Sequence, residues 1–203
     1  MRTLTVTGHG TVSVEPDAAN VRVAAVQRAA SVTDAVAGVD AAVRVAGATA
    51  REFTDAAHIS SSGLSVWPQH DHQGQATGFE ARHSLAIRCP DLAAAGGLVS
   101  ALAERVGDRL VVEGVSLVVS EPLEGEDRAR AAAFEDAQRR AAHLAQLADD
   151  VLGQVQAVSE GGGSSIHAEG GGTLAYRSSL DISFEGGQQA VSTSVTVTFA
   201  LAE

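Results

Sequence analysis

The stretch LTVTGHGTVSVEPDAANVRV, from Leu4 to Val23, decides how the chain begins to fold. Apolar and polar residues alternate on both sides of a Gly-His-Gly triplet, which is the period of a strand with one buried face. A dinucleotide-binding loop needs a third glycine and a helix directly after the first strand, whereas here the alternation continues. We therefore interpret Gly8 and Gly10 as a turn or bulge between extended segments, and Pro16 with Asp17 as the turn into the next strand.

Three segments have apolar residues at the three- and four-residue spacing of a helix. The spacing predicts helices over Ser31 to about Ala57, over Asp91–Val106, and over about Glu126 to Leu152. The first two begin at residues that favour the N-cap position. Gly107 and Gly153 are expected to end the second and third helices, because glycine adopts the left-handed conformation that follows many helices.

Between these helices the apolar residues recur at every second position. A strand-helix-strand-strand order occurs twice, over about 21–89 and 110–202, with the short helix between them and an N-terminal strand arm at 3–14. One-sided alternation is typical of antiparallel strands that are covered on a single face. We expect an α+β fold in one domain over residues 1–203, a two-layer sandwich of mainly antiparallel sheet with helices on one face, built from two β-α-β-β units.

The composition excludes several classes of partner. Acidic residues outnumber basic ones 25 to 14, the formal net charge is −11, and every basic residue is an arginine. A nucleic-acid groove or an anionic membrane surface requires clustered positive charge, so neither partner is expected. No apolar run of about 18 residues is present, so we expect no membrane insertion. Met1 leads directly into strand-like alternation without the pattern of a signal peptide, which favours a cytoplasmic location, or a periplasmic or secreted one if a leader has been removed.

His70 and His72 flank Asp71 in a polar connection between two predicted strands. Residues i and i+2 of an extended chain face the same side, so both imidazoles could reach one Zn or Cu ion with a third ligand from elsewhere. The alternative is a solvated hairpin loop. No cofactor is predicted, and no nucleophile elbow or other catalytic motif is present, so the chain is not expected to be an enzyme.

Cys89 is the single cysteine of the chain and cannot form an internal disulfide. It stands just before the predicted helix that begins at Asp91, where the helix N-terminus could lower the pKa of the thiol. Cys89 is therefore a candidate redox-sensing residue. The alternative is a small buried residue that only packs.

Residues 159–190 form the longest stretch without a regular pattern. Apolar residues nevertheless recur along it: Ile166, Leu174, Tyr176, Leu180, Ile182 and Phe184. Such spacing indicates a segment that docks on its own or a neighbour's surface, either as inter-subunit packing or as a mobile flap. The polar sheet face and the sheet edges must also be solvated or paired, so a second copy of the chain is the first partner to expect.

The opening stretch, with Gly8, Gly10, Pro16 and Asp17, resembles the N-terminal signature of SIMPL-domain proteins, the family of the YggE-like proteins and the periplasmic immunogenic protein. The stretches GFEARHSLAIRCPDLAAAGGLVSAL, VEGVSLVVSEP and ARAAAFEDAQRRAAHLAQLADDVLGQVQAVSEGG are similar to later parts of the same family. The resemblance covers nearly the whole chain. Many members carry a signal peptide, which this chain lacks, and His9 stands where an acidic residue is common.

The resemblance implies an α+β fold, large ring- or channel-like homo-oligomers in some members, and oxidative-stress defence in others. It carries over no catalytic residue. Our leading hypothesis is therefore a non-enzymatic, self-assembling protein that forms a homo-oligomer, and the resemblance suggests a stress-related role. The alternative is a metal- or small-ligand-binding protein that uses the loop of His70 and His72.

Overall fold

The contacts of the chain divide it into two compact units in the computed structural model, which describes residues 2–161, 165–169 and 182–202. The first unit contains Met1–Glu15, Glu121–Gly171 and Gly187–Glu203, and the second contains Pro16–Ser120 and Gly172–Gly186. The sequence predicted one domain over 1–203 without this division. Each unit has its own hydrophobic core between a sheet and its helices, which confirms the predicted antiparallel α+β architecture with helices on one face.

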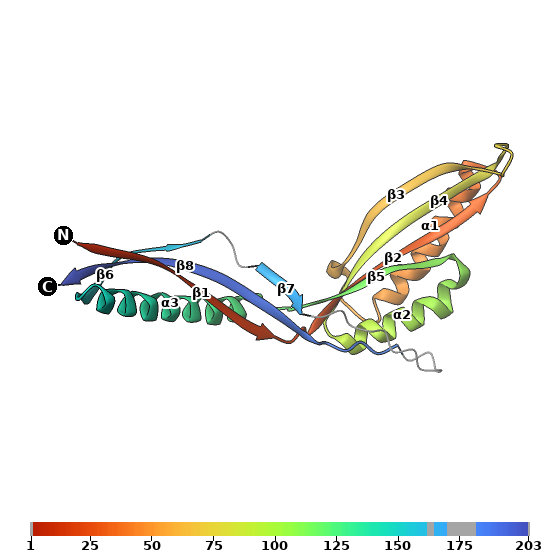
Figure 1. Cartoon of the computed structure of the whole chain (residues 1–203). Coiled ribbons are helices and arrows are strands. Elements are labelled where there is room, and N and C mark those ends of the chain that lie inside the picture. Colours follow the sequence, from red (N-terminus) through yellow and green to blue (C-terminus); the bar gives the residue numbers. More distant parts are fainter. Residues whose placement is uncertain (1, 162–164, 170–181, 203) are drawn as a thin grey trace. The chain divides into compact units, whose positions relative to one another are not determined.

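Figure 1 labels the elements along the chain. The first half contains β1 (Thr3–Val14), β2 (Ala18–Ala29), α1 (Val32–Ala50), the short helix η1 (Ala56–His58), β3 (Ile59–His70), β4 (Ala76–Cys89) and α2 (Leu92–Val106). The second half contains the short helix η2 (Gly107–Arg109), β5 (Leu110–Val118), α3 (Pro122–Leu147), β6 (Val151–Glu160), β7 (Ser165–Glu169) and β8 (Gln188–Ala202). None of the helices in the described residues is long and apolar enough to cross a membrane.

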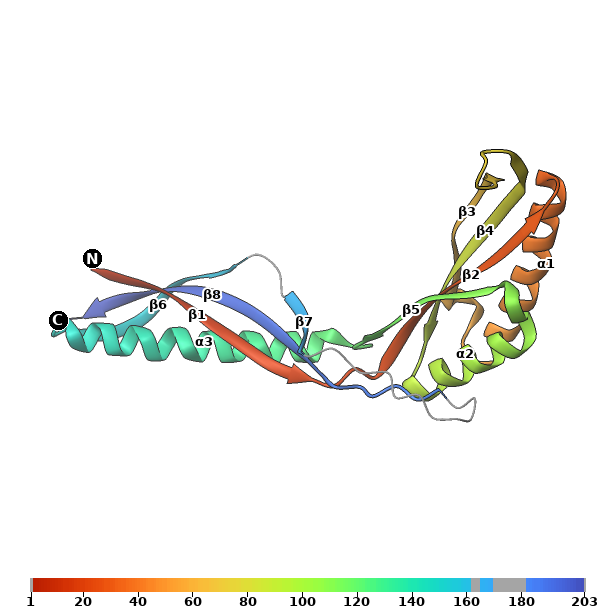
Figure 2. The same cartoon turned by 45° about the vertical axis from the view of Figure 1, so that its right-hand side comes forward.

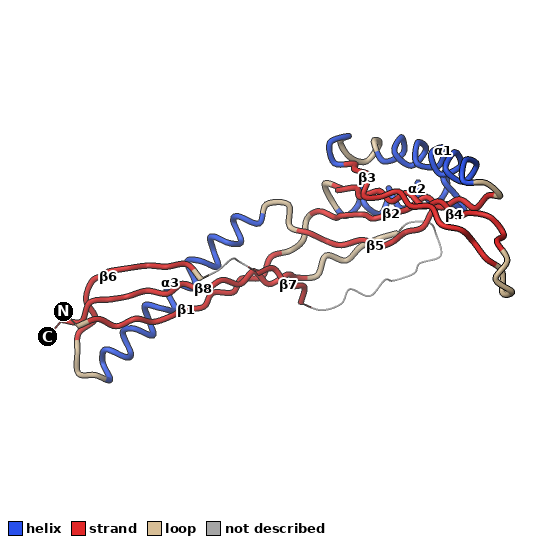
Figure 3. The backbone as a smooth tube through the Cα atoms, turned by 90° about the horizontal axis from the view of Figure 1, so that it is seen from above, coloured by secondary structure: helices blue, strands red, loops and turns tan. Residues whose placement is uncertain are grey.

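The first unit is a four-stranded antiparallel sheet covered on one face by α3. Strand β8 pairs with β1 along nearly its whole length, and with β6 and β7 along its other edge, as Figure 3 shows for β1, β8 and β6. The alternate residues Val195, Val197 and Phe199 of β8 face α3 and form the core. The period of two in this strand therefore follows from burial on one face.

The second unit is a four-stranded antiparallel sheet in the order β3-β4-β2-β5. Helices α1 and α2 both cover the same face of it (Figure 2). Its core contains aliphatic residues of ordinary size, among them Val21, Ile87, Leu98 and Leu102. The opposite face carries no helix, so polar and charged side chains remain there.

Strand pairing crosses the boundaries of the two predicted halves. Strand β5 was expected to be the first strand of the predicted half over 110–202, but it pairs with β2 in the second unit. Strand β1, the expected N-terminal arm, pairs with β8 in the first unit. The predicted elements follow one another in the expected order. The alternation of apolar residues along a strand, however, does not show with which other strand it pairs.

Three helix boundaries differ from the predicted ones. Helix α1 ends at Ala50 instead of near Ala57. Helix α3 begins four residues earlier than predicted because Pro122 occupies its first turn, where a missing N–H costs nothing. It ends at Leu147, and the chain turns at Asp149, whose φ is 56°, so that Gly153 lies in β6 and does not end a helix.

The two glycines of β1 form neither a turn nor a bulge, which corrects the interpretation from the sequence. Strand β1 runs unbroken for 12 residues in constant register with β8. A Cβ atom at Gly8 would lie 2.1 Å from the carbonyl oxygen of Ala133, and one at Gly10 would lie 2.0 Å from that of Ala129. Only glycine therefore permits α3 to lie this close to the strand.

Helix α3 contributes a matching row of small residues. The residues that it buries recur mostly at every fourth position: Gly125, Ala129, Ala133, Ala137, Ala141 and Ala145. Two residues advance a strand by about 6.6 Å and four residues advance a helix by about 6 Å, so Gly8 and Gly10 meet successive turns of α3. These small residues, which have no reactive side chains, thus form the surface of α3 that contacts β1.

Replacing Gly8 or Gly10 with alanine is expected to destabilise the protein by about 1–3 kcal/mol, because the added methyl group must push α3 away from β1. Urea denaturation measures the change. The matched control is His9→Ala, which lies between them with its side chain exposed on the opposite face and should change the stability little. Equal effects of all three substitutions would contradict the close contact.

Candidate functional site

The turn of Pro16 and Asp17 into β2 is held by the end of β5. The Asp17 carboxylate accepts hydrogen bonds from the Ser120 backbone N–H, at 2.7 Å, and from the Ser120 hydroxyl, while the Asp17 N–H donates to the Val118 carbonyl at 3.2 Å. The Ser120 hydroxyl and N–H lower the pKa of the Asp17 carboxyl, and Arg88 adds to this effect. This part of the opening stretch therefore has a structural role.

Because the pKa of Asp17 is lowered in the folded protein, its contribution to stability is complete above about pH 4 and is lost as the pH falls through the lower folded value. We expect Asp17→Asn to be less stable than the unmodified protein at pH 7. The difference between the two should narrow below pH 4, as measured by urea denaturation across the pH range. A difference that is constant with pH would show that the ionised carboxylate is not what Ser120 binds.

The structure places His70 at the end of β3, and Asp71 and His72 in the turn that leads to β4. The Asp71 Oδ1 atom accepts hydrogen bonds from the N–H groups of Gln73 and Gln75, both at 2.9 Å, so this carboxylate organises the turn. Within the described residues, no group of three or more His, Cys, Asp and Glu side chains is placed to hold a metal ion. A site at His70 and His72 stays a prediction that requires a ligand from another molecule or from outside that part of the chain.

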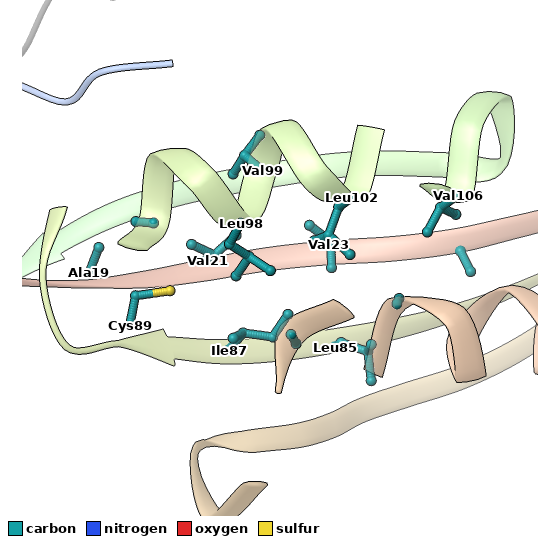
Figure 4. Packing of buried hydrophobic residues seen from close by; sticks show 14 of the residues in the cluster. Ala19, Val21, Val23, Leu85, Ile87, Cys89, Leu98, Val99, Leu102 and Val106 are labelled. Atoms are coloured by element: carbon teal, nitrogen blue, oxygen red, sulfur yellow. The ribbon is translucent and has the colours of Figure 1, made fainter. Parts of the chain in front are cut away.

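Cys89 ends β4 inside the core of the second unit, with 0% of its surface exposed (Figure 4). Burial, and to a smaller extent the carboxylate of Asp91, raise the pKa of its thiol to about 11. The prediction that the helix N-terminus lowers the pKa of the Cys89 thiol is therefore wrong. Desolvation outweighs the helix N-terminus here, and the thiol stays protonated at neutral pH.

Alkylation tests the state of Cys89 directly. At pH 8 we expect iodoacetamide to label the folded protein at least about a hundredfold more slowly than the urea-unfolded protein, because the thiolate fraction is small and the sulfur is covered. Mass spectrometry measures the labelling. Selective oxidation of Cys89 in the folded protein by dilute peroxide would overturn this expectation and restore the redox hypothesis.

Part of the long segment 159–190 docks on the chain's own surface. Residues Ser165–Glu169 form β7, and Phe184 packs against the core of the second unit. A Cβ atom at Gly96 of α2 would lie 2.0 Å from the carbonyl oxygen of Ile182, so the segment lies directly on that helix. Leu174, Tyr176 and Leu180, for which docking was also predicted, lie outside the described residues.

One edge of the first sheet is closed by charged side chains of α3. The Asp136 carboxylate accepts the N–H of His9 at 3.0 Å, and Arg140 donates to the Thr7 carbonyl at 3.2 Å. The His9 N–H, followed by Arg139 and Arg140, lowers the pKa of Asp136. Backbone groups that another strand could use are thus occupied by the helix, which the glycines allow to lie close by.

At the opposite edge of the same sheet, no side chain among the described residues binds a backbone group of β6, and α3 reaches the strand through the ion pair of Arg130 with Glu160 at its end. Three valines of β6 are exposed, Val151 by 62%, Val155 by 43% and Val158 by 55%. The residues from Val151 to Ser159 carry no charge, in a chain whose net charge is −11. Leu144 and Leu147, in the last turns of α3, are also exposed.

The second sheet has a comparable edge in β3. Its residues from Ile59 to His70 include no Asp, Glu or Arg, and Leu64 and Trp67 are exposed. The candidate residues predicted from the sequence were chosen for reactive side chains, so neither β3 nor β6 was identified as an exposed edge strand. The signal was present as strand-like segments without charge, although only the sheet order shows that β3 and β6 are edges.

Comparison with known proteins found one family. The model of the SIMPL family, described as a protein of unknown function (DUF541), matches residues 4–199. No curated protein matches the chain.

Proposed function

The chain belongs to the SIMPL family, and from that premise we propose that it is a non-enzymatic protein that assembles with copies of itself through its free sheet edges. The observation that carries the proposal is the exposed, uncharged stretch Val151–Ser159 of the edge strand β6, which precedes the charged Glu160 at the end of the strand. An edge strand presents unpaired N–H and C=O groups, and monomeric proteins usually cover such an edge or place charges along it. This chain does so at β1 but not at β6.

The distribution of charge supports a second copy as the partner. Two molecules with a net charge of −11 repel each other over most of their surfaces. Along Val151–Ser159 no like charges meet, so two copies can approach there and bury the exposed valines. A strand added to β6 also pairs the backbone groups of both copies.

The presence of two unlike edges extends the proposal to closed assemblies. Pairing of β6 with β6 produces a two-fold dimer, whereas pairing of β6 with β3 of another copy continues from molecule to molecule. Repeated unlike contacts form a ring when the rotation closes. The ring- or channel-like assembly implied by the family resemblance corresponds to this second case, and a stress-related role would act through assembly, because Cys89 offers no reactive thiol.

Light scattering coupled to gel filtration tests the assembly at micromolar concentration. We expect a mass of at least two chains, and a lower mass for the double variant Val155→Glu and Val158→Glu, since the new charges repel across the edge. Leu123→Glu is the matched control, because Leu123 is 71% exposed on α3 and lies outside the edge strands. Leu64→Glu reports separately on β3.

A strictly monomeric unmodified protein would overturn the proposal. An assembly whose mass is unaffected by the charges at both edges would assign the contact to a different surface.

A further inference from the structure

The uncovered face of the second sheet contains a depression with a volume of about 560 Å³. It lies over β2, β4 and β5, beside the start of β3, and its residues Asn20 and Arg22 alternate with core residues that face α1 and α2. The polar side chains that line it are Asn20, Arg22, His58, Ser60, Arg88 and Ser116. Among the residues that the structure describes, no Asp or Glu side chain lines it.

Small residues flank Arg22 in the sheet, and one of them, Ala86, lines the depression. Arg22 of β2 is opposite Ala86 of β4 on one side and Gly114 of β5 on the other. A Cβ atom at Gly114 would have only the Arg22 guanidinium within 4 Å, at 3.9 Å, so the space above this residue is open. The small neighbours leave room for a molecule beside the guanidinium.

Neither arginine of the depression forms an ion pair with a carboxylate in the described residues, but the positive charges of Arg22 and Arg88 contribute to the lowered pKa of Glu113 and of Asp17. Ion pairs in the described residues use Arg2, Arg28, Arg44, Arg82, Arg105, Arg130, Arg139 and Arg140. The side chain of Arg22 makes no hydrogen bond to another described residue, and the side chain of Arg88 donates there only to the Ser120 carbonyl, at 3.4 Å. Most of their N–H groups are therefore available to a ligand.

The nearest carboxylates are already occupied. Glu113 accepts hydrogen bonds from Arg82 at 2.7 Å and from Ser84 at 2.9 Å, and these contacts lower its pKa. Asp17 is bound by Ser120. Both carboxylates are thus held by these contacts, and the charges of Arg22 and Arg88 act on them without a hydrogen bond.

We infer that this depression binds a small anion that carries a carboxylate or phosphate group, held by Arg22 and Arg88. The planar guanidinium group matches the oxygens of both anions with two parallel hydrogen bonds. The amide of Asn20 supplies a neutral donor beside them, whereas the hydroxyls of Ser60 and Ser116 donate to the carbonyls of Ala86, at 3.4 Å, and Asn20, at 3.5 Å. This site is separate from the edge β6 but borders β3 through Ser60.

Calorimetric titration of the full chain with inorganic phosphate and with citrate tests the inference and distinguishes the two anion classes. Sodium chloride at matched ionic strength controls for screening. We expect saturable binding of at least one probe. Arg22→Gln and Arg88→Gln should each weaken it by about tenfold or more, because each removes charge-assisted hydrogen bonds.

Two further variants separate the site from the charge of the whole chain. Arg128→Gln makes the same change of charge at an exposed position of α3 and should leave binding unchanged. Gly114→Leu keeps both arginines but fills the open space, and it should abolish binding. The inference is overturned if neither probe binds saturably, or if Arg22→Gln and Arg88→Gln behave like Arg128→Gln while circular dichroism shows that all variants are folded.

Discussion

The backbone of α3 lies directly against the backbone of β1 at Gly8 and Gly10, and the first unit depends on this contact. A single methyl group at either position would overlap carbonyl oxygens of Ala129 or Ala133. The close approach also brings Asp136 and Arg140 of α3 to the edge of β1, where they bind its free backbone groups. One constraint thus packs the sheet, closes one of its edges and leaves β6 as the edge open to a partner.

The second unit is built from side chains of ordinary size, and helices cover only one face of its sheet. The face toward α1 and α2 takes the apolar residues and encloses Cys89, which loses the reactivity that its position in the sequence suggested. The face away from the helices keeps Arg22 and Arg88 in a depression among small residues. The candidate site of this unit is therefore formed by the two arginines and not by the cysteine.

Local features of the fold were predictable from the sequence. Ser31 and Asp91 cap their helices through their side chains and Gly107 follows α2, because such contacts span only a few residues. The end of α3 was missed because Asp149 adopts a conformation that is rare for residues other than glycine. The burial of the Cys89 thiol and the availability of the Arg22 and Arg88 guanidinium groups were not predictable for a different reason. Both depend on neighbours that are distant in the sequence.

The sequence by itself determined the family, the order of the elements and the presence of one-sided antiparallel sheets, because the apolar period records which face of each element is buried. Only the tertiary structure decided that β5 joins β2 and that β1 joins β8, since strands of equal period can pair with any compatible edge. The tertiary structure likewise decided that Gly8 and Gly10 permit a close contact with α3. Glycine marks either a bend or a close approach, and the backbone that approaches here lies more than a hundred residues away.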